Sequence, residues 1–264
     1  MHLSVLLSSL PGEFESAVQR AAALGFRHVD VVALADRPAA HREALAETGL
    51  LVCCAAVGRG LPDGYALDAA NPRVRHAALQ QVQQQIADAA QLGATHCYIV
   101  PGMDAGAEGR QRFADACGCL ADFAAGRMVR LGVEHVPGRA LPTAAAALVW
   151  LKEAGHDNLF LLLDVGHCLI SGEDPVAAVA QAGSRLGYVH LDDNDGIGDL
   201  HWPLLTGRLT EGVLRSFLAA LVANGYDGAL TLELSPRNAD PVGALAQGKE
   251  LLERLGKLQG IDLV

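Results

Sequence analysis

Short apolar runs alternate with helical stretches eight times along the chain. The apolar runs cover residues 3–8, 28–33, 50–57, 96–101, 130–136, 159–164, 188–191 and 229–234. The stretch after each run has apolar residues at helical spacing, which is the pattern of a helix with one buried side. Repeated strand–helix units within 264 residues are typical of an α/β fold, a single (β/α)8 TIM barrel of parallel strands. We therefore predict that residues 1–264 form one barrel domain.

The ends of the expected helices carry their own signals. Gly25 and Gly49 each follow a helical stretch, as glycines that end helices do, and Asn71-Pro72 has the cap and first-turn proline of a helix start. The helices are expected at residues 13–24, 71–92, 106–125, 143–154, 175–182, 210–224 and 240–258, and one more helix, after the second apolar run, is expected to end at residue 47. The segment 58–70 is glycine-rich and long for a connection, which makes it a candidate lid. A doubly wound open sheet is the alternative fold, but no glycine-rich phosphate turn follows an early strand.

The charge balance excludes several classes of partner. The chain has 20 basic and 30 acidic residues, a formal net charge of −10, and no run rich in lysine or arginine. Nucleic-acid binding is not expected, since it depends on neutralising phosphates. No apolar run approaches the length that spans a membrane and no signal peptide is recognisable, so no membrane association is expected. The six cysteines have no Cys-x-x-Cys spacing and predict buried, reduced thiols in a cytoplasmic protein.

An acidic loop follows the seventh apolar run. Four carboxylates and two imidazoles are concentrated within residues 188–202: Asp192, Asp193, Asp195, Asp199, His190 and His201. Like charges at this density repel unless a positive group neutralises them, and a divalent cation is one such group. The alternative is a solvated acidic loop with two incidental histidines.

Four consecutive strands each have a potential metal ligand at the end that they share. In a (β/α)8 barrel the catalytic groups lie at the C-terminal ends of the strands. The residues at these positions are Glu134, Asp164, His190 and Glu233. A carboxylate in an apolar strand needs a partner because burying a bare charge is costly, and one cation would satisfy all four residues. Mixed oxygen and nitrogen ligands suit Mn, Mg, Co, Zn or Fe and do not distinguish among them.

These positions resemble those of a known family. Glu134, the Asp164-Val-Gly-His167 segment, residues 190–207 and Glu233 are similar to motifs of the xylose isomerase-like barrel superfamily, which includes sugar phosphate isomerases, ketose 3-epimerases, inosose dehydratases and endonuclease IV. The resemblance extends over the whole chain. It implies that Glu134, Asp164, His190 and Glu233 bind one divalent metal. It also implies that Glu134 and Glu233 are the catalytic acid/base pair and that His167 contacts substrate oxygens.

The resemblance to endonuclease IV argues against a nuclease. That enzyme holds three zinc ions and uses two further histidines on the third and fourth strands. The corresponding strand ends here are Cys54-Ala-Ala-Val-Gly58 and Ile99-Val-Pro-Gly102, which have no histidine. His167, Asp199 and His201 still match the outline of a second metal site. We favour the alternative, in which His167 and His201 bind substrate hydroxyls and Asp199 fixes an imidazole tautomer.

Several other residues have weaker signals. His135 is expected to point away from the site, into packing, because neighbouring strand residues alternate. Arg139 is either a ligand for a substrate carboxylate or phosphate or a surface charge. Trp202 either stacks on a sugar face or closes the barrel mouth. His28 is expected at the opposite rim with a structural role, and no cluster is predicted for His2.

The predicted function is that of a divalent-metal-dependent isomerase or epimerase, acting on a small polyhydroxy carbonyl compound such as a sugar or sugar phosphate. One of Glu134 and Glu233 would remove a proton next to the carbonyl, and the other would return one to the enediolate. A dehydratase of a keto-polyol, of the inosose type, shares the first half of this chemistry. A phosphoesterase or endonuclease-like hydrolase, and a barrel that binds a ligand without turnover, remain as alternatives. A homo-oligomer is left open.

Overall fold

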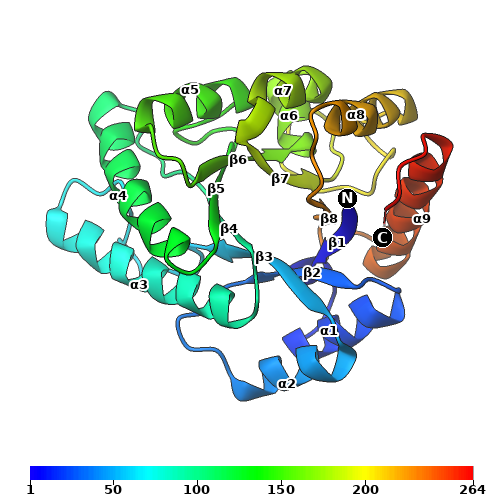
Figure 1. Cartoon of the computed structure of the whole chain (residues 1–264), viewed down its shortest axis with the longest axis horizontal. Coiled ribbons are helices and arrows are strands. Elements are labelled where there is room, and N and C mark those ends of the chain that lie inside the picture. The colour runs from blue at the N-terminus through cyan, green and yellow to red at the C-terminus, as the bar shows by residue number, and fades with distance from the viewer. Residues whose placement is uncertain (264) are drawn as a thin grey trace.

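The computed structural model describes residues 1–263, and at its centre a closed barrel of parallel strands runs in the order β1 to β8 (Figure 1). The strands are β1 His2–Leu6, β2 His28–Val32, β3 Leu51–Val57, β4 His96–Ile99, β5 Arg130–Glu134, β6 Leu159–Asp164, β7 Leu186–Leu191 and β8 Ala229–Leu232. The surrounding helices are α1 Phe14–Ala23, α2 Ala39–Thr48, α3 Pro72–Gln91, α4 Ala107–Ala125, α5 Ala144–Ala154, α6 Val165–Ser171, α7 Pro175–Ala182, α8 Glu211–Ala223 and α9 Pro241–Leu258. Short 3₁₀ turns are η1 Leu7–Ser9 and η2 Gly183–Arg185.

The pairing of β8 with β1 confirms the predicted barrel and excludes an open sheet. Several strand boundaries differ from the prediction: β1 gives way to η1 at Leu7, and β7 already begins at Leu186. Strands β4, β5 and β8 each end two residues earlier than predicted, at Ile99, Glu134 and Leu232. Helix α6 is an addition to the expected elements. It has only 7 residues, too few for a helical period to be recognised, and it begins at the cap that Asp164 provides for the backbone N–H of His167.

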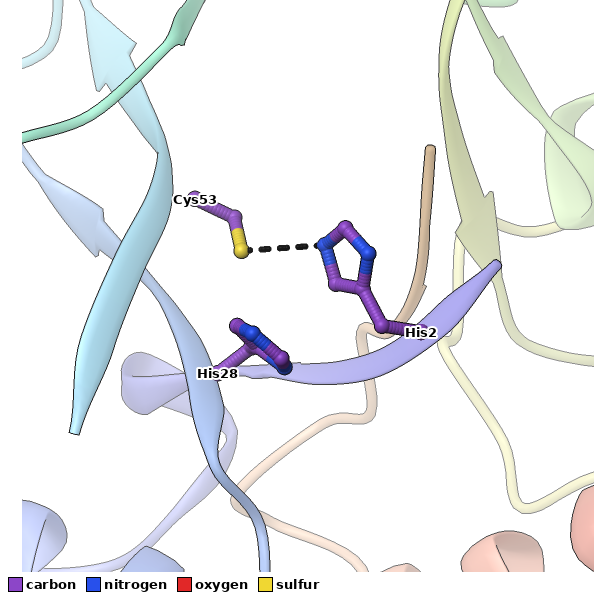
Figure 2. A group of neighbouring side chains, drawn as sticks. All are labelled: His2, His28 and Cys53. Atoms are coloured by element: carbon purple, nitrogen blue, oxygen red, sulfur yellow. Dashed lines mark hydrogen bonds between the residues drawn. The ribbon is translucent and has the colours of Figure 1, made fainter. Parts of the chain in front are cut away.

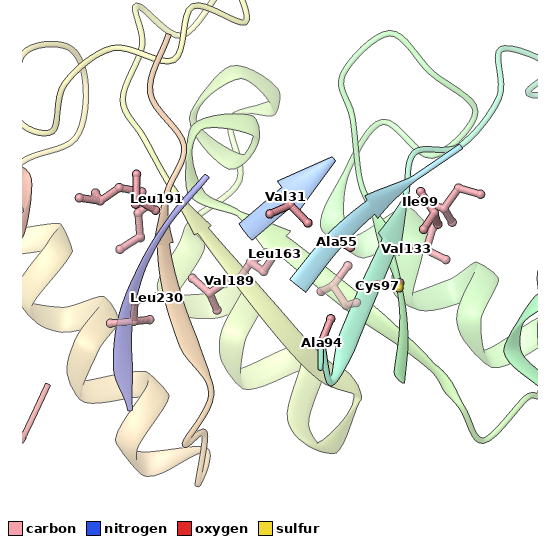
Figure 3. Packing of buried hydrophobic residues seen from close by; sticks show 14 of the residues in the cluster. Val31, Ala55, Ala94, Cys97, Ile99, Val133, Leu163, Val189, Leu191 and Leu230 are labelled. Atoms are coloured by element: carbon pink, nitrogen blue, oxygen red, sulfur yellow. The ribbon is translucent and has the colours of Figure 1, made fainter. Parts of the chain in front are cut away.

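Two layers of apolar side chains hold the barrel together. The outer layer packs between strands and helices and includes Val31, Ala55, Val133, Leu163 and Val189 (Figure 3). The inner layer fills the barrel itself: Cys53, Cys54, Ala56, Tyr98, Leu162, Tyr188 and Ala229. Strands buried on both faces explain why the apolar runs of the sequence show no strict alternation.

Polar caps fix the first turns of several helices. The side chain of Asn71 accepts a hydrogen bond from the Arg73 N–H at 3.0 Å, with Pro72 at the first helical position, as predicted. Thr143 caps α5 and Thr210 caps α8 in the same way. Each cap satisfies a backbone donor that would otherwise lack a partner, so these helices start at defined residues along the barrel rim.

The segment 58–70, the candidate lid, is attached to the barrel at both ends. Gln85 on α3 accepts a hydrogen bond from Gly58 N–H at 2.6 Å and donates one to the Arg59 carbonyl at 2.8 Å. Near the other end, Arg112 donates to the carbonyl of Asp68 at 2.7 Å. The middle of the segment, residues 62–65, is exposed. Any opening of this loop would therefore occur between the two anchors.

The six cysteines are free thiols, and all but Cys119 are buried, in agreement with the prediction from their spacing. Among residues 1–263, none of the helices combines the length and the apolar character that a bilayer crossing requires.

Candidate functional site

The four residues at the ends of β5 to β8 converge at the C-terminal mouth of the barrel. Glu134 and Asp164 are the last residues of their strands, His190 is the last but one residue of β7, and Glu233 directly follows β8. Each offers a ligand atom, and these four atoms all lie within 4.8 Å of one another. Glu134 is 3% exposed, and Asp164 and His190 are completely buried. These four side chains therefore share one compartment, and their role as metal ligands stays a prediction.

His190 is held with one ring nitrogen directed at each of two carboxylate groups. Its Nε2 lies 3.6 Å from Oδ2 of Asp30, and its Nδ1 lies 2.5 Å from Oε2 of Glu233. Asp30 is fully buried in the middle of β2. A carboxylate at Nε2 favours the tautomer with the proton on Nε2, which leaves the Nδ1 lone pair facing Glu233.

The donor set fits a divalent cation. Nδ1 of His190, Oε2 of Glu233 and Oδ2 of Asp164 are buried and make no hydrogen bond. Lone pairs from one imidazole and two carboxylates that face one another repel unless a proton or a cation lies between them. Hard oxygen donors combined with one imidazole suit Mg²⁺, Mn²⁺ or a similar ion.

The charges of the site are strongly coupled. Burial favours the neutral form of His190, but the nearby Glu233 carboxylate outweighs it and raises the pKa of His190 well above its ordinary value. Burial likewise pushes the pKa of Glu233 upward, yet the His190 charge holds that pKa down at about 2. Burial and the neighbouring Asp192 raise the pKa of Asp164 well above its ordinary value. Positive charge is therefore required here, and protonated imidazoles supply it when no cation is bound.

His167 lies beside this group on α6. Its Nδ1 lies 2.8 Å from the carbonyl oxygen of His135, and since a carbonyl can only accept, Nδ1 carries a proton. Nε2 lies 3.3 Å from Oδ1 of Asp199. Burial lowers the pKa of His167, but Asp164 and Asp199 together raise it to about 11. His167 is therefore a fixed, positively charged donor at the edge of the site.

The second predicted cluster also comes together. Asp199 Oδ1 lies 3.3 Å from Nε2 of His167 and 3.1 Å from Nε2 of His201. The other nitrogen of His201 lies 2.8 Å from Oδ2 of Asp192. His201 has a φ of 46°, in the left-handed region that non-glycine residues seldom adopt. Such strain is concentrated at functional sites, which supports a role for this imidazole at the mouth of the barrel.

The carboxylates of the acidic loop after β7 have two different kinds of partner. The carboxylate of Asp193 accepts hydrogen bonds from the N–H groups of Asn194, Gly207 and Leu209 at 2.7–2.8 Å. Asp195 accepts from two further backbone N–H groups at 2.8 and 2.9 Å. Backbone donors therefore neutralise these two carboxylates without a metal. Only Asp192 and Asp199 of the acidic run face the imidazoles.

Sequence reasoning missed two residues of the site. Asp30 accepts hydrogen bonds from Tyr188 Oη at 2.7 Å and Ser4 Oγ at 2.9 Å, and through His190 it connects the barrel interior to the mouth. The sequence feature that could have identified Asp30 is a charged residue inside an apolar strand. Arg59, in the exposed part of the segment 58–70, has its pKa raised because the charges of Tyr98, Glu134 and Glu233 outweigh the effect of its partial burial. The sequence feature that could have identified Arg59 is a single basic residue in a glycine-rich loop.

The weaker predictions have mixed outcomes. His135 is fully buried and is not one of the four converging ligands, and its Nε2 accepts a hydrogen bond from the Asp164 N–H at 3.3 Å, which agrees with the predicted packing role. Arg139 is exposed and donates to the Pro101 carbonyl at 3.3 Å, and its substrate role stays a prediction, as does that of Trp202. The prediction that His2 belongs to no cluster is wrong, because His2 lies against His28 and Cys53.

Comparison with known sequences gives a family and several relatives. The profile described as "Xylose isomerase-like TIM barrel" matches residues 18–255. An L-ribulose 3-epimerase from Methylomonas sp. is 34% identical over 56% of this chain and 51% of that protein. A second L-ribulose 3-epimerase, from Mesorhizobium japonicum, is 29% identical over 78% of this chain and 66% of its own length. A 3-dehydroshikimate dehydratase from Pseudomonas putida is 25% identical over 89% of this chain and 38% of that protein. The chain thus spans between about a third and two thirds of these relatives.

Comparison with solved structures agrees on the fold. A structure of L-ribulose 3-epimerase superimposes with a TM-score of 0.82, covers 98% of this chain and 95% of its own, and is 23% identical. At that identity the similarity shows the architecture alone.

Proposed function

The chain belongs to the xylose isomerase-like TIM barrel family, and from that premise we propose that it is a divalent-metal-dependent epimerase of a small ketose. The observation that carries the proposal is the convergence of Glu134, Asp164, His190 and Glu233 within 4.8 Å, with two glutamates in one metal-binding set. The epimerase activity of the relatives from Methylomonas sp. and Mesorhizobium japonicum supports the reaction class.

The metal would be held by these four residues. Their buried and unpaired ligand atoms, on Asp164, His190 and Glu233, support this assignment. When bound, a divalent cation polarises the substrate carbonyl and so acidifies the neighbouring C–H. Asp30 contributes indirectly, because its contact with Nε2 of His190 keeps Nδ1 available as a ligand.

Glu134 and Glu233 would be the acid/base pair. Both reach the same imidazole, with Glu134 Oε1 at 3.8 Å and Glu233 Oε2 at 2.5 Å from Nδ1 of His190, yet they come from strands β5 and β8. A substrate carbon between them would present one face to each carboxylate. Removal of the proton by one glutamate, and delivery of a different proton to the opposite face by the other glutamate in its protonated form, inverts the configuration of that carbon.

Charged donors around the pair would bind the substrate oxygens. Burial lowers the pKa of His167, but Asp164 and Asp199 raise it to about 11, which favours a doubly protonated ring that can donate to the negatively charged oxygen of an enediolate. Arg59 adds a second cation from the segment 58–70. Two carboxylate bases beside two cationic side chains at one end of the barrel suit proton abstraction next to a carbonyl.

The test is an assay of the Mn²⁺-loaded protein with L-ribulose, D-allulose and 3-dehydroshikimate in D₂O. We expect the C-3 epimer of a ketose to form, with deuterium from the solvent at C-3. Ketoses that neither change configuration nor take up deuterium at any concentration tested would contradict the proposal. Heat-denatured protein loaded with the same Mn²⁺ is the control for reaction on free metal.

A dehydratase is the second candidate. The similarity to 3-dehydroshikimate dehydratase over 89% of this chain favours it over a hydrolase or a barrel without turnover. Both reactions begin with the same proton abstraction, so the glutamate pair serves either. Loss of water from 3-dehydroshikimate without any ketose epimerisation would replace our proposal with this one.

A further inference from the structure

The N-terminal end of the barrel, opposite the candidate active site, has its own cluster of metal-binding side chains. His2 is the first residue of β1, His28 is the first residue of β2, and Cys53 lies in β3 (Figure 2). Nε2 of His2 lies 3.2 Å from Sγ of Cys53, and the two imidazole rings are 4.3 Å apart between centroids. Each residue offers one ligand atom within 4.8 Å of those of the other two.

A β-bulge turns Cys53 toward the two histidines. Val29 of β2 pairs with Val52 of β3, but the next residue, Asp30, pairs with Cys54, so Cys53 is an extra residue in the register. Strict alternation would send Cys53 and Cys54 to opposite faces of the strand. Both instead belong to the layer inside the barrel. Bulges re-aim side chains and are typical of functional sites, and they are rare in parallel pairs.

The polar contacts of this cluster are unusually sparse. The Cys53 thiol is the partner of the His2 ring, and Nδ1 of His28 is buried without a hydrogen bond. Neither imidazole forms an ion pair with a carboxylate within residues 1–263, in contrast to His167, His190 and His201 at the other end. One proton shared between the His2 ring and the Cys53 thiol satisfies that pair, while Nδ1 of His28 stays without a donor, and the chain places no carboxylate or cation in the cluster.

We propose that His2, His28 and Cys53 form a second metal site, specific for Zn²⁺ or a similar thiophilic ion. Thiolate and imidazole are the ligands that zinc prefers, with bonds of about 2.3 Å to sulfur and about 2.0 Å to nitrogen. A tetrahedral site with these bond lengths has ligand atoms about 3.5 Å apart, close to the 3.2 Å between His2 and Cys53. The harder carboxylate-rich set at the other end favours Mg²⁺ or Mn²⁺.

Water would complete the coordination, or His96 after a change of its ring orientation. His96 is the first residue of β4, its Nε2 is buried without a partner, and it pairs in register with Cys54. With it, the first four strands would each contribute a nitrogen or sulfur ligand at one end of the barrel. A metal there would join β1, β2 and β3, so it would stabilise the packing of these first three strands.

The test uses Co²⁺, which substitutes for Zn²⁺ and absorbs light through thiolate-to-metal charge transfer only when sulfur is a ligand. The apoprotein is titrated with Co²⁺ and its near-ultraviolet spectrum recorded. We expect about one equivalent of a sulfur-dependent band that Zn²⁺ abolishes by competition. The four-residue group at the C-terminal mouth has no sulfur ligand, so its occupancy does not contribute to the band.

Variants locate the ligand. Cys53→Ala should remove the band, and His2→Gln, at the start of the first strand, should weaken Co²⁺ binding at least tenfold. Cys54→Ala and Cys119→Ala are matched controls that should keep the band, and thermal unfolding of each apoprotein verifies its fold. Absence of a band in excess Co²⁺, or a band that survives in both Cys53→Ala and His2→Gln, would overturn the proposal.

Discussion

Nδ1 of His201 lies 2.8 Å from Oδ2 of Asp192, a carboxylate that is completely buried below the mouth of the barrel. The pair orients the imidazole, because it leaves Nε2 of His201 facing outward to Asp199 at 3.1 Å. Burial lowers the pKa of His201, but Asp192 raises it to about 10, so the ring is a proton donor at neutral pH. A cationic imidazole is a poor metal ligand and a good donor to a substrate hydroxyl.

The first prediction concerns this imidazole. His201→Asn keeps a residue that tolerates the left-handed backbone but removes the charged ring. We expect the variant to keep one equivalent of Mn²⁺ and to raise KM about tenfold, the effect of about 1.4 kcal/mol of lost substrate binding. Equilibrium dialysis counts the metal, and Mn²⁺ is used because a thiolate site holds it weakly. Two equivalents in the wild type, one of them lost in the variant, would instead establish a metal site at His167, Asp199 and His201.

The second prediction concerns the proposed base. Glu233→Gln keeps the size of the side chain and an oxygen that can bind a metal but cannot accept a proton. We expect turnover to fall about 10³-fold, the usual effect of losing a general base, together with deuterium incorporation from solvent. Glu250→Gln changes an exposed residue of α9 and should leave both unchanged. Wild-type exchange in the Glu233 variant would remove this residue from the acid/base pair.

The third prediction distinguishes a sugar from a sugar phosphate. Arg59 is charged and close to the glutamate pair, so Arg59→Met should raise KM more than it lowers kcat. If the substrate carries a phosphate, the increase should be about 100-fold, and for a neutral sugar about tenfold or less. Arg73→Met, on the exposed first turn of α3, is the matched control. An unchanged KM for every substrate would mean that Arg59 does not reach the substrate.

The fourth prediction concerns the glycine of the Asp164-Val-Gly-His167 segment. A Cβ atom at Gly166 would overlap the carboxylate of Asp192. Gly166→Ala should therefore displace Asp192, release His201 and destabilise the protein by about 1–3 kcal/mol. Gly118→Ala, in α4 with no atom near the added methyl group, should instead stabilise it by up to about 1 kcal/mol. Urea unfolding of both variants measures the two effects, and equal stabilities would show that Asp192 is not held against Gly166.

The fifth prediction is acid sensitivity at the N-terminal end of the barrel. Burial and the charge of Arg130 lower the pKa of His96 to about 4 from 6.5. Above pH 6.5 the residue is neutral in both states and contributes nothing. Between pH 6.5 and 4 the unfolded chain binds the proton first, so stability falls, by at most about 3 kcal/mol. In metal-free protein, His96→Phe should flatten this part of the stability profile, and His76→Gln, on an exposed turn of α3, should not. A profile unchanged by His96→Phe would contradict the assignment.

The four-residue group could be predicted from the sequence for a simple reason. In a closed parallel barrel, the ends of all strands meet at one rim, so any residue that ends a strand is placed there. Once the apolar runs define the strands, Glu134, Asp164, His190 and Glu233 can be assigned without knowledge of packing. The caps at Asn71 and Thr143 are local in the same sense, since each bonds to a backbone group two or three residues away.

Contacts between distant segments could not be predicted in this way. Asp30 meets Tyr188 across the barrel, at a separation of 158 residues, and Gln85 on α3 anchors the loop that carries Arg59. His2 and Cys53 face each other because of one bulge in the pairing of β2 with β3. The sequence determined the strands, the rim and the ligands at strand ends, because these follow from local periodicity. Tertiary structure decided the partners of those ligands, because a bulge or an anchored loop depends on long-range packing that no local pattern encodes.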